Sequence, residues 1–393
     1  MPTLPLVTAA ASFEVHVPDD ALDDLQGRLR RTRFAEDFGN DAWSFGIPGG
    51  YLRALIDHWT LQFDWRAQEQ RMNRYSHFLA DIDGVPVHFV HERGRGPSPI
   101  PLVLTHGWPW TFWDYERLIG PLSDPVAFGG DHRDAFDVVV PSLPGTAFSS
   151  PLRTTGVGIL ATAELWLRLM RDTLGYDRFG AAGGDSGAFI TARLGHAHPE
   201  HLIGIHLNFP ATATMAALGS VRPEDYSPEE RQWLADPPQA RGTSAHMAVH
   251  VEDPQTLAWA MNDSPAGLAA WMVERRRNWS DCHGDVERRF TKDELLTGVS
   301  LYWLTETFHT SVRFYAESFR RPWPLVHDRL PPIEAPTAVA VFPRELLRVP
   351  RRFMERQANV ARWTVMPRGG HFAPAEEPGL MLEDIRAFFR GFR

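Results

Sequence analysis

Two candidate nucleophiles stand side by side in the segment 182–188, which reads Ala-Gly-Gly-Asp-Ser-Gly-Ala. An apolar run precedes the segment and a helix-forming run follows it, so the pattern predicts a strand, a sharp turn and a helix, the arrangement of a nucleophile elbow. Such a turn needs small residues two positions before and two positions after the nucleophile. Gly183 and Gly187 meet this need for Asp185, whereas Ser186 would have one glycine and one alanine. The spacing therefore favours Asp185.

The two side chains would perform different chemistry. A serine attacks an acyl carbon and leaves an ester that water can cleave. At a saturated carbon, such as that of an epoxide or an alkyl halide, serine would leave a stable ether. A carboxylate leaves an ester whose carbonyl belongs to the protein, and an activated water can attack that carbonyl. Asp185 therefore indicates attack on an alkyl carbon.

Glu345 and His371 complete the order nucleophile, acid, histidine that is typical of α/β-hydrolases. Each of the three residues follows an expected strand, and ligands bind at that end of a parallel sheet. Another post-strand loop carries His106-Gly107-Trp108. We expect the backbone N–H groups of Trp108 and Ser186 to form an oxyanion hole, and His106 to structure the loop rather than act as a base.

The elements expected around these loops form a doubly wound, mostly parallel sheet, because strand patterns alternate with helical ones. Strands are expected at 77–82, 85–90, 102–105, 136–140, 178–182, 202–207, 337–342 and 363–366. We divide the chain into an N-terminal helical extension (1–75), a first core part (76–209), a helical lid (210–330) and a second core part (331–393). In the lid, Asn262-Asp263-Ser264 before Pro265 predicts a capped helix start.

The composition is that of a globular enzyme, with 43% hydrophobic residues and a net charge of −9. The negative charge argues against nucleic acid or an anionic membrane as partner. No apolar run reaches membrane-spanning length, the N-terminus lacks a secretory pattern, and Cys282 stands alone. We therefore expect a cytoplasmic protein that acts on a small molecule, with a homodimer as a candidate assembly, and no cofactor or metal.

Taken together, these residues resemble the microsomal-type epoxide hydrolases, in their soluble bacterial branch. The resemblance covers nearly the whole chain. The motifs that carry it are Phe13-Glu14-Val15, His106-Gly107-Trp108-Pro109, Pro141-Ser142-Leu143-Pro144-Gly145, Gly183-Gly184-Asp185, Asn262-Asp263-Ser264-Pro265, Arg313-Phe314-Tyr315, Phe342-Pro343-Arg344-Glu345-Leu346, Gly369-Gly370-His371-Phe372-Ala373 and Glu376-Glu377-Pro378. The resemblance implies that Asp185 is the nucleophile, that His371 activates water and that Glu345 orients His371. It also implies two lid tyrosines that protonate the epoxide oxygen.

The chain departs from the family pattern around this site. Tyr315 stands where one lid tyrosine is expected, but the position of the other holds His246. Trp110 replaces a usual glycine, Ser186 a usual tryptophan, and Thr146 a usual tyrosine. Several changes around one cavity suggest a substrate pocket, lined by Trp110 and Thr146, that is reshaped for an unusual substrate.

Three functional hypotheses follow from these patterns. The first is hydrolysis of an epoxide to a vicinal diol through an alkyl-aspartate ester, on a bulky aromatic or polycyclic natural-product intermediate. The second keeps the fold but replaces hydrolysis with acid–base chemistry, such as cyclisation or carbon–carbon bond formation in polyketide or antibiotic biosynthesis. The third is a binding protein without catalysis, and the presence of all three triad residues argues against it.

Overall fold

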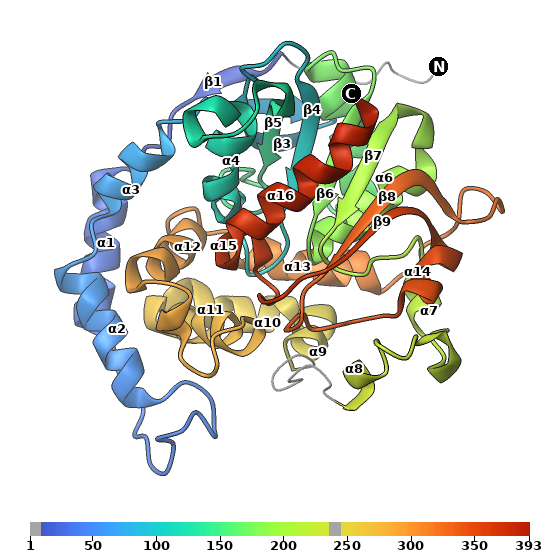
Figure 1. The fold of residues 1–393 in the computed structure, drawn as a ribbon. Coiled ribbons are helices and arrows are strands. Elements are labelled where there is room, and N and C mark those ends of the chain that lie inside the picture. Colours follow the sequence, from blue (N-terminus) through green and yellow to red (C-terminus); the bar gives the residue numbers. More distant parts are fainter. Residues whose placement is uncertain (1–8, 236–244) are drawn as a thin grey trace.

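A single nine-stranded sheet organises the computed structural model, which describes residues 9–235 and 245–393 (Figure 1). The strand order is β1-β2-β3-β5-β4-β6-β7-β8-β9. The strands are β1 (Ala11–Phe13), β2 (His77–Ile82), β3 (Val85–Glu92), β4 (Ile100–Thr105), β5 (Phe136–Pro141), β6 (Phe179–Gly183), β7 (Leu202–Leu207), β8 (Ile333–Val341) and β9 (Ala358–Val365). All eight strands expected from the sequence are present, within a few residues of their expected ends.

The sheet is antiparallel from β1 to β5 and parallel from β5 to β9. Along the central strands, alternate residues enter two separate cores. Leu102 and Leu104 pack on one face, while Val103 between them packs on the other. This alternation follows from the two-residue period of a strand. Because both faces are covered, the central strands read as continuous apolar runs.

Helices cover both faces of the sheet, and they place the catalytic loops at one edge. One core is completed by α4 and α16, and the other by α5, α6 and α14. The helices are α1 (Asp19–Arg30), α2 (Gly49–Leu61), α3 (Trp65–Met72), α4 (Glu116–Ser123), α5 (Ile159–Arg168), α6 (Ser186–Ala197), α7 (Met215–Leu218), α8 (Gln232–Ala235), α9 (Ala245–Glu252), α10 (Pro254–Asp263), α11 (Pro265–Trp279), α12 (Lys292–Leu304), α13 (Phe308–Phe319), α14 (Arg351–Gln357), α15 (Ala373–Glu376) and α16 (Pro378–Phe389). In the described segments, no helix combines the length and apolar character needed to cross a bilayer.

The N-terminal extension differs from the expected purely helical segment. It begins with β1, which pairs antiparallel with β2 and so adds an edge strand to the sheet. Helix α1 starts at Asp19, Pro18 is its N-cap, and no side chain forms a capping hydrogen bond. Asp19 and Asp20 lie in the first turn, where negative charge favours the helix dipole. The short β1 was missed because a three-residue edge strand carries almost no periodic signal.

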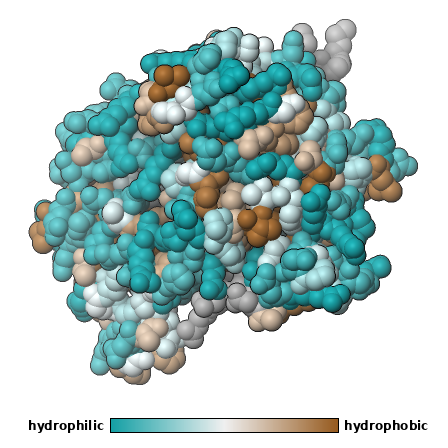
Figure 2. Space-filling view, viewed as in Figure 1, coloured by the Kyte–Doolittle hydropathy of each residue, from teal (hydrophilic) through white to brown (hydrophobic). Residues whose placement is uncertain are grey.

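Helices α9 to α13 of the expected lid lie together beyond one end of the sheet, and α1 and α2 of the extension pack against α11 and α12 (Figure 1). Arg28 of α1 pairs with Asp263 of α10 at 2.7 Å. The expected start of α11 is confirmed, because Ser264 accepts a hydrogen bond from Gly267 N at 3.0 Å and Pro265 occupies the first turn. Figure 2 shows an outer face on which apolar residues are scattered among polar ones.

Candidate active site

Asp185 lies at the apex of the turn between β6 and α6, while Ser186 is the first residue of that helix. The backbone of Asp185 has φ 52° and ψ −129°, a conformation that residues other than glycine rarely adopt. A Cβ at Gly183 would collide with the backbone of Gly187, and a Cβ at Gly187 would collide with the carbonyl of Thr105. The turn therefore requires glycine on both sides of Asp185, and strain of this kind typically marks a functional residue.

The carboxylate of Asp185 faces the loop that follows β4. The backbone N–H of Trp108 donates to Asp185 Oδ1 at 2.9 Å. Gly107 has to be glycine because a Cβ there would overlap the Asp185 side chain. Burial alone would raise the pKa of Asp185, but bonds from His371 and from the backbone N–H groups of Trp108 and Ser186 outweigh it and lower the pKa. Asp185 is therefore ionised at neutral pH.

His371 lies between Asp185 and a buried acid, Glu345. Its Nε2 lies 3.4 Å from Asp185 Oδ2, and its Nδ1 lies 2.6 Å from Glu345 Oε1. The Glu345 oxygen also accepts the backbone N–H of Leu346 at 2.6 Å, which fixes the carboxylate. Burial disfavours the imidazolium, but the charges and hydrogen bonds of Glu345 and Asp185 raise the pKa of His371 to about 10. The resting site is thus a carboxylate–imidazolium–carboxylate arrangement.

The lid brings Tyr315 and His246 together above this group. His246 on α9 stacks on Trp108 with ring centroids 5.7 Å apart and planes at 9°, and its ring lies 5.6 Å from Tyr315 on α13. Burial, followed by the charge of Asp185, raises the pKa of Tyr315 well above its ordinary value. Tyr315 therefore keeps its proton at neutral pH and is available as a hydrogen-bond donor.

The other residues expected near the site are His106, Trp110 and Thr146. His106 is structural, as expected: its Nδ1 bonds to Gly107 O, its Nε2 accepts from Leu143 N at 3.0 Å, and burial lowers its pKa to about 4. Trp110 is fully buried with its ring 5.5 Å from that of His371. Thr146 is buried in the turn after β5, and its place in the substrate pocket stays a prediction.

Comparison with known proteins places this site in a family. Residues 10–115 match the model described as "Epoxide hydrolase N terminus", and residues 100–276 match "alpha/beta hydrolase fold". A candidate epoxide hydrolase of Stigmatella aurantiaca is 39% identical over 384 residues, covering 97% of this chain and 85% of that protein. Epoxide hydrolase 1 of Oryctolagus cuniculus is 32% identical, covering 96% and 88%. The chain belongs to the epoxide hydrolase family.

Solved structures of epoxide hydrolases agree with this assignment. The Aspergillus niger enzyme superposes with a TM-score of 0.84 at 28% identity, covering 98% of this chain and 97% of that chain. The juvenile hormone epoxide hydrolase of the silkworm Bombyx mori gives 0.85 at 26%, covering 98% and 95%. The α/β-hydrolase fold expected from the sequence is confirmed.

The structure adds residues to this epoxide hydrolase site that the sequence did not indicate. His250, one turn after His246 on α9, is fully buried with its ring 4.5 Å from Trp108, and burial lowers its pKa to about 2. The backbone carbonyl of Trp279, at the end of α11, accepts a hydrogen bond from the backbone N–H of His371 at 2.9 Å. The i, i+4 spacing of the two histidines could have indicated His250, because such positions share one helix face.

Glu376 connects the catalytic loop of the epoxide hydrolase with its lid. One carboxyl oxygen accepts the backbone N–H of Phe372, next to His371, at 2.9 Å, and the other accepts that of Asp281 at 2.7 Å. Burial, reinforced by the charge of Asp281, raises the pKa of Glu376 to about 7, although its backbone bonds and Arg289 oppose the shift.

Glu376→Gln should therefore change how stability depends on pH. A folded-state pKa above the unfolded value contributes stability that is fully present below the unfolded value and is lost as pH rises through about 7. The free energy of unfolding lost between pH 4.5 and 7 is on the order of 3 kcal/mol. Glutamine does not ionise, so the substitution removes this pH dependence. We expect the wild-type melting temperature to fall more than that of the variant between pH 5 and 8. Exposed Glu383→Gln should follow the wild type, and identical profiles for wild type and Glu376→Gln would contradict the assignment.

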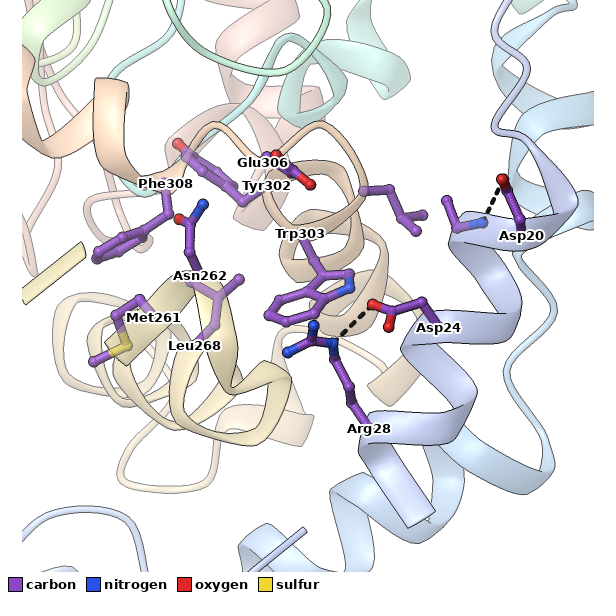
Figure 3. A pocket seen from close by; sticks show the side chains of 12 residues that line it. Asp20, Asp24, Arg28, Met261, Asn262, Leu268, Tyr302, Trp303, Glu306 and Phe308 are labelled. Carbon is purple, nitrogen blue, oxygen red and sulfur yellow. Dashed lines mark hydrogen bonds and ion pairs between the residues drawn. The ribbon is translucent and has the colours of Figure 1, made fainter. Parts of the chain in front are cut away.

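A groove of about 300 Å³ opens between α1 and the lid. Figure 3 shows Asp24 and Arg28 of α1 on one side of it and Trp303 of the lid facing them. Tyr302 and Phe308 also line the groove and contact the wall of the active site. The Tyr302 hydroxyl donates to Trp110 O at 2.6 Å, and the Phe308 ring lies 6.3 Å from His250. The extension thus lines a groove whose other wall contacts Trp110 and His250 of the candidate active site.

Proposed function

We propose that the protein hydrolyses an epoxide to a vicinal diol through a covalent ester on Asp185. The observation that carries the proposal is an ionised carboxylate at the elbow, with a buried His371–Glu345 pair behind it and Tyr315 in the lid above. Its first test is diol formation from a panel of aryl epoxides. A protein that binds these compounds but converts none of them would contradict the proposal.

In the first half-reaction an oxygen of Asp185 attacks one epoxide carbon. The C–O bond of the ring breaks, and the released oxygen takes a proton from Tyr315, with His246 as the second hydrogen-bond donor. A carboxylate needs no general base for this attack, because it is already ionised at neutral pH. The product is a hydroxyalkyl ester of Asp185.

In the second half-reaction His371 changes from acid to base. Esterification removes the negative charge of Asp185, and with it two of the interactions that hold the His371 pKa high. His371 can then pass its proton to the tyrosinate and accept one from water, which attacks the ester carbonyl. The bond between that carbon and the alkyl oxygen breaks, and the leaving alkoxide takes the proton that His371 received from water, which releases the diol. The reformed acid of Asp185 then gives its proton to His371.

The chamber favours an aromatic substrate. Trp108, Trp110, Trp279 and Tyr315 surround the catalytic group, and their rings present flat apolar faces. We propose a bulky aromatic or polycyclic epoxide of natural-product origin as the substrate. The relatives named above all carry epoxide hydrolase names, which favours hydrolysis over the acid–base alternative.

The role of His246 can be tested by replacing its imidazole with other aromatic rings that can stack on Trp108. His246→Tyr should open styrene oxide at least as fast as the wild type, because it supplies a second phenol beside Tyr315. His246→Phe keeps an aromatic ring for stacking on Trp108 but has no donor, and should slow alkylation on the order of 10-fold. Stopped-flow measurement of single turnovers gives both rates. Equal rates for tyrosine and phenylalanine would remove His246 from the mechanism.

A further inference from the structure

Asn208 lies at a position in the sheet where a catalytic side chain is expected, although the mechanism above does not use it. It directly follows β7, and β7 lies between β6, which carries the nucleophile, and β8, which leads to Glu345. Because the carboxyl ends of parallel strands meet at one edge, the residue after β7 is placed between those two catalytic groups. The neighbouring ring of Phe209 lies 6.2 Å from that of His371.

The carboxamide of Asn208 is buried and lacks hydrogen-bond partners. The residue is 1% exposed, and neither Oδ1 nor Nδ2 is bonded to any other described residue. Its backbone N–H is held by Gly183 O at 3.2 Å, so the residue cannot turn away. Its amide lies against Gly184, since a Cβ there would overlap it. A buried amide usually finds a partner, and leaving one unmade costs about 1–3 kcal/mol.

Residues of the same site carry further buried polar atoms that have no hydrogen-bond partner among the described residues. Trp110, which also touches Gly184, has an indole N–H with no acceptor among the described residues. Glu345 contacts His371 through Oε1, whereas no described residue donates a hydrogen bond to its Oε2. His371 Nε2 stands 3.4 Å from Asp185, longer than a well-formed hydrogen bond. Polar groups gathered in this way suit a water molecule, which needs two to four partners.

We propose that Asn208 binds the water that hydrolyses the ester on Asp185. The amide oxygen accepts one hydrogen of this water, His371 Nε2 accepts the other, and the free lone pair faces the ester carbon. When the water attacks, its proton passes to His371 and the bond from the ester carbon to the alkyl oxygen breaks, as in the second half-reaction above. The inference rests on the proposed covalent route and adds to it a residue that acts only in the second step.

Single-turnover kinetics with styrene oxide test this role. Asn208→Leu keeps the branched shape of the side chain but removes its hydrogen-bonding atoms. We expect alkylation to stay within about threefold of the wild type and ester hydrolysis to slow on the order of 10- to 100-fold. kcat should therefore fall while kcat/KM changes little, and the ester should accumulate in the intact mass. Thr191→Val is the control: it removes a buried hydroxyl on α6, and the variant should behave like the wild type in both steps.

Asn208→Ala distinguishes a catalytic from a structural role. Alanine leaves a polar space that a second water can fill, so its ester should hydrolyse faster than that of the leucine variant, although the cavity lowers its melting temperature more. If Asn208 is only structural, the alanine variant should hydrolyse its ester more slowly than the leucine variant, and alkylation and hydrolysis should decline together. Wild-type ester hydrolysis in Asn208→Leu, or parallel decline of both steps, would overturn the inference. If His371→Gln accumulates an ester and Asn208→Leu does not, only the role of Asn208 fails; if neither does, the covalent route itself fails.

Discussion

Asp185→Ala should lower epoxide hydrolysis on the order of 10⁵-fold, because it removes the atom that forms the covalent bond. Ser186→Ala should stay within about threefold of the wild type, since it keeps the backbone N–H that faces Asp185 and removes only the hydroxyl. The two substitutions are at adjacent positions, and the melting temperature of each variant shows whether either change affects folding. Their kcat/KM values on an aryl epoxide decide between the two side chains.

Isotope labelling gives an independent test of the same residue. In a single turnover in water enriched in heavy oxygen, the label should enter the Asp185 carboxylate, because water attacks the ester carbonyl and the diol takes its oxygen from the protein. Mass spectrometry of the peptide containing Asp185 measures the incorporation. Label that appears in the diol during the first turnover would show direct attack of water on the epoxide, and the covalent mechanism would be wrong.

His371→Gln should trap the ester. Its effect falls on the second half-reaction, where loss of the base should slow hydrolysis on the order of 10³-fold or more, while alkylation continues. The intact mass of the variant should then increase by the mass of the epoxide. This expectation follows from the geometry, because Nε2 faces Asp185 and Nδ1 is held by Glu345.

Glu345→Gln provides the graded comparison for the histidine variant. It keeps an amide near His371 Nδ1 but loses the charge that contributes to the pKa of about 10. We expect a smaller loss in hydrolysis than for His371→Gln, with the acid limb of the pH profile shifted toward lower pH, because without the Glu345 charge the imidazole loses its proton more readily and is available as a base at lower pH. Wild-type turnover in both variants, with no trapped ester, would contradict these roles.

The sequence by itself determined the fold class, and it indicated Asp185, Glu345 and His371, which the structure brings together. The β strands were predictable because both sheet faces are covered, so β4 to β8 are apolar runs between turn signals. The placement of Asp185 at the apex was predictable because glycine stands at 183 and 187, and the requirement at 183 is local, since a Cβ there would meet the backbone of Gly187. The capped start of α11 was predictable for the same reason, since Ser264 and Pro265 act within one turn.

Only the tertiary structure decided which distant residues join these stations. The strand β1 gains its stability from pairing with β2, more than sixty residues away, and so gives no local periodic signal. The burial of His250 depends on the approach of α9 to Trp108, which no short segment encodes. Asn208 looks like an ordinary strand end in the sequence. Its significance depends on the order of β6, β7 and β8, which places Asn208, whose amide has no partner among the described residues, between the strands that lead to Asp185 and Glu345.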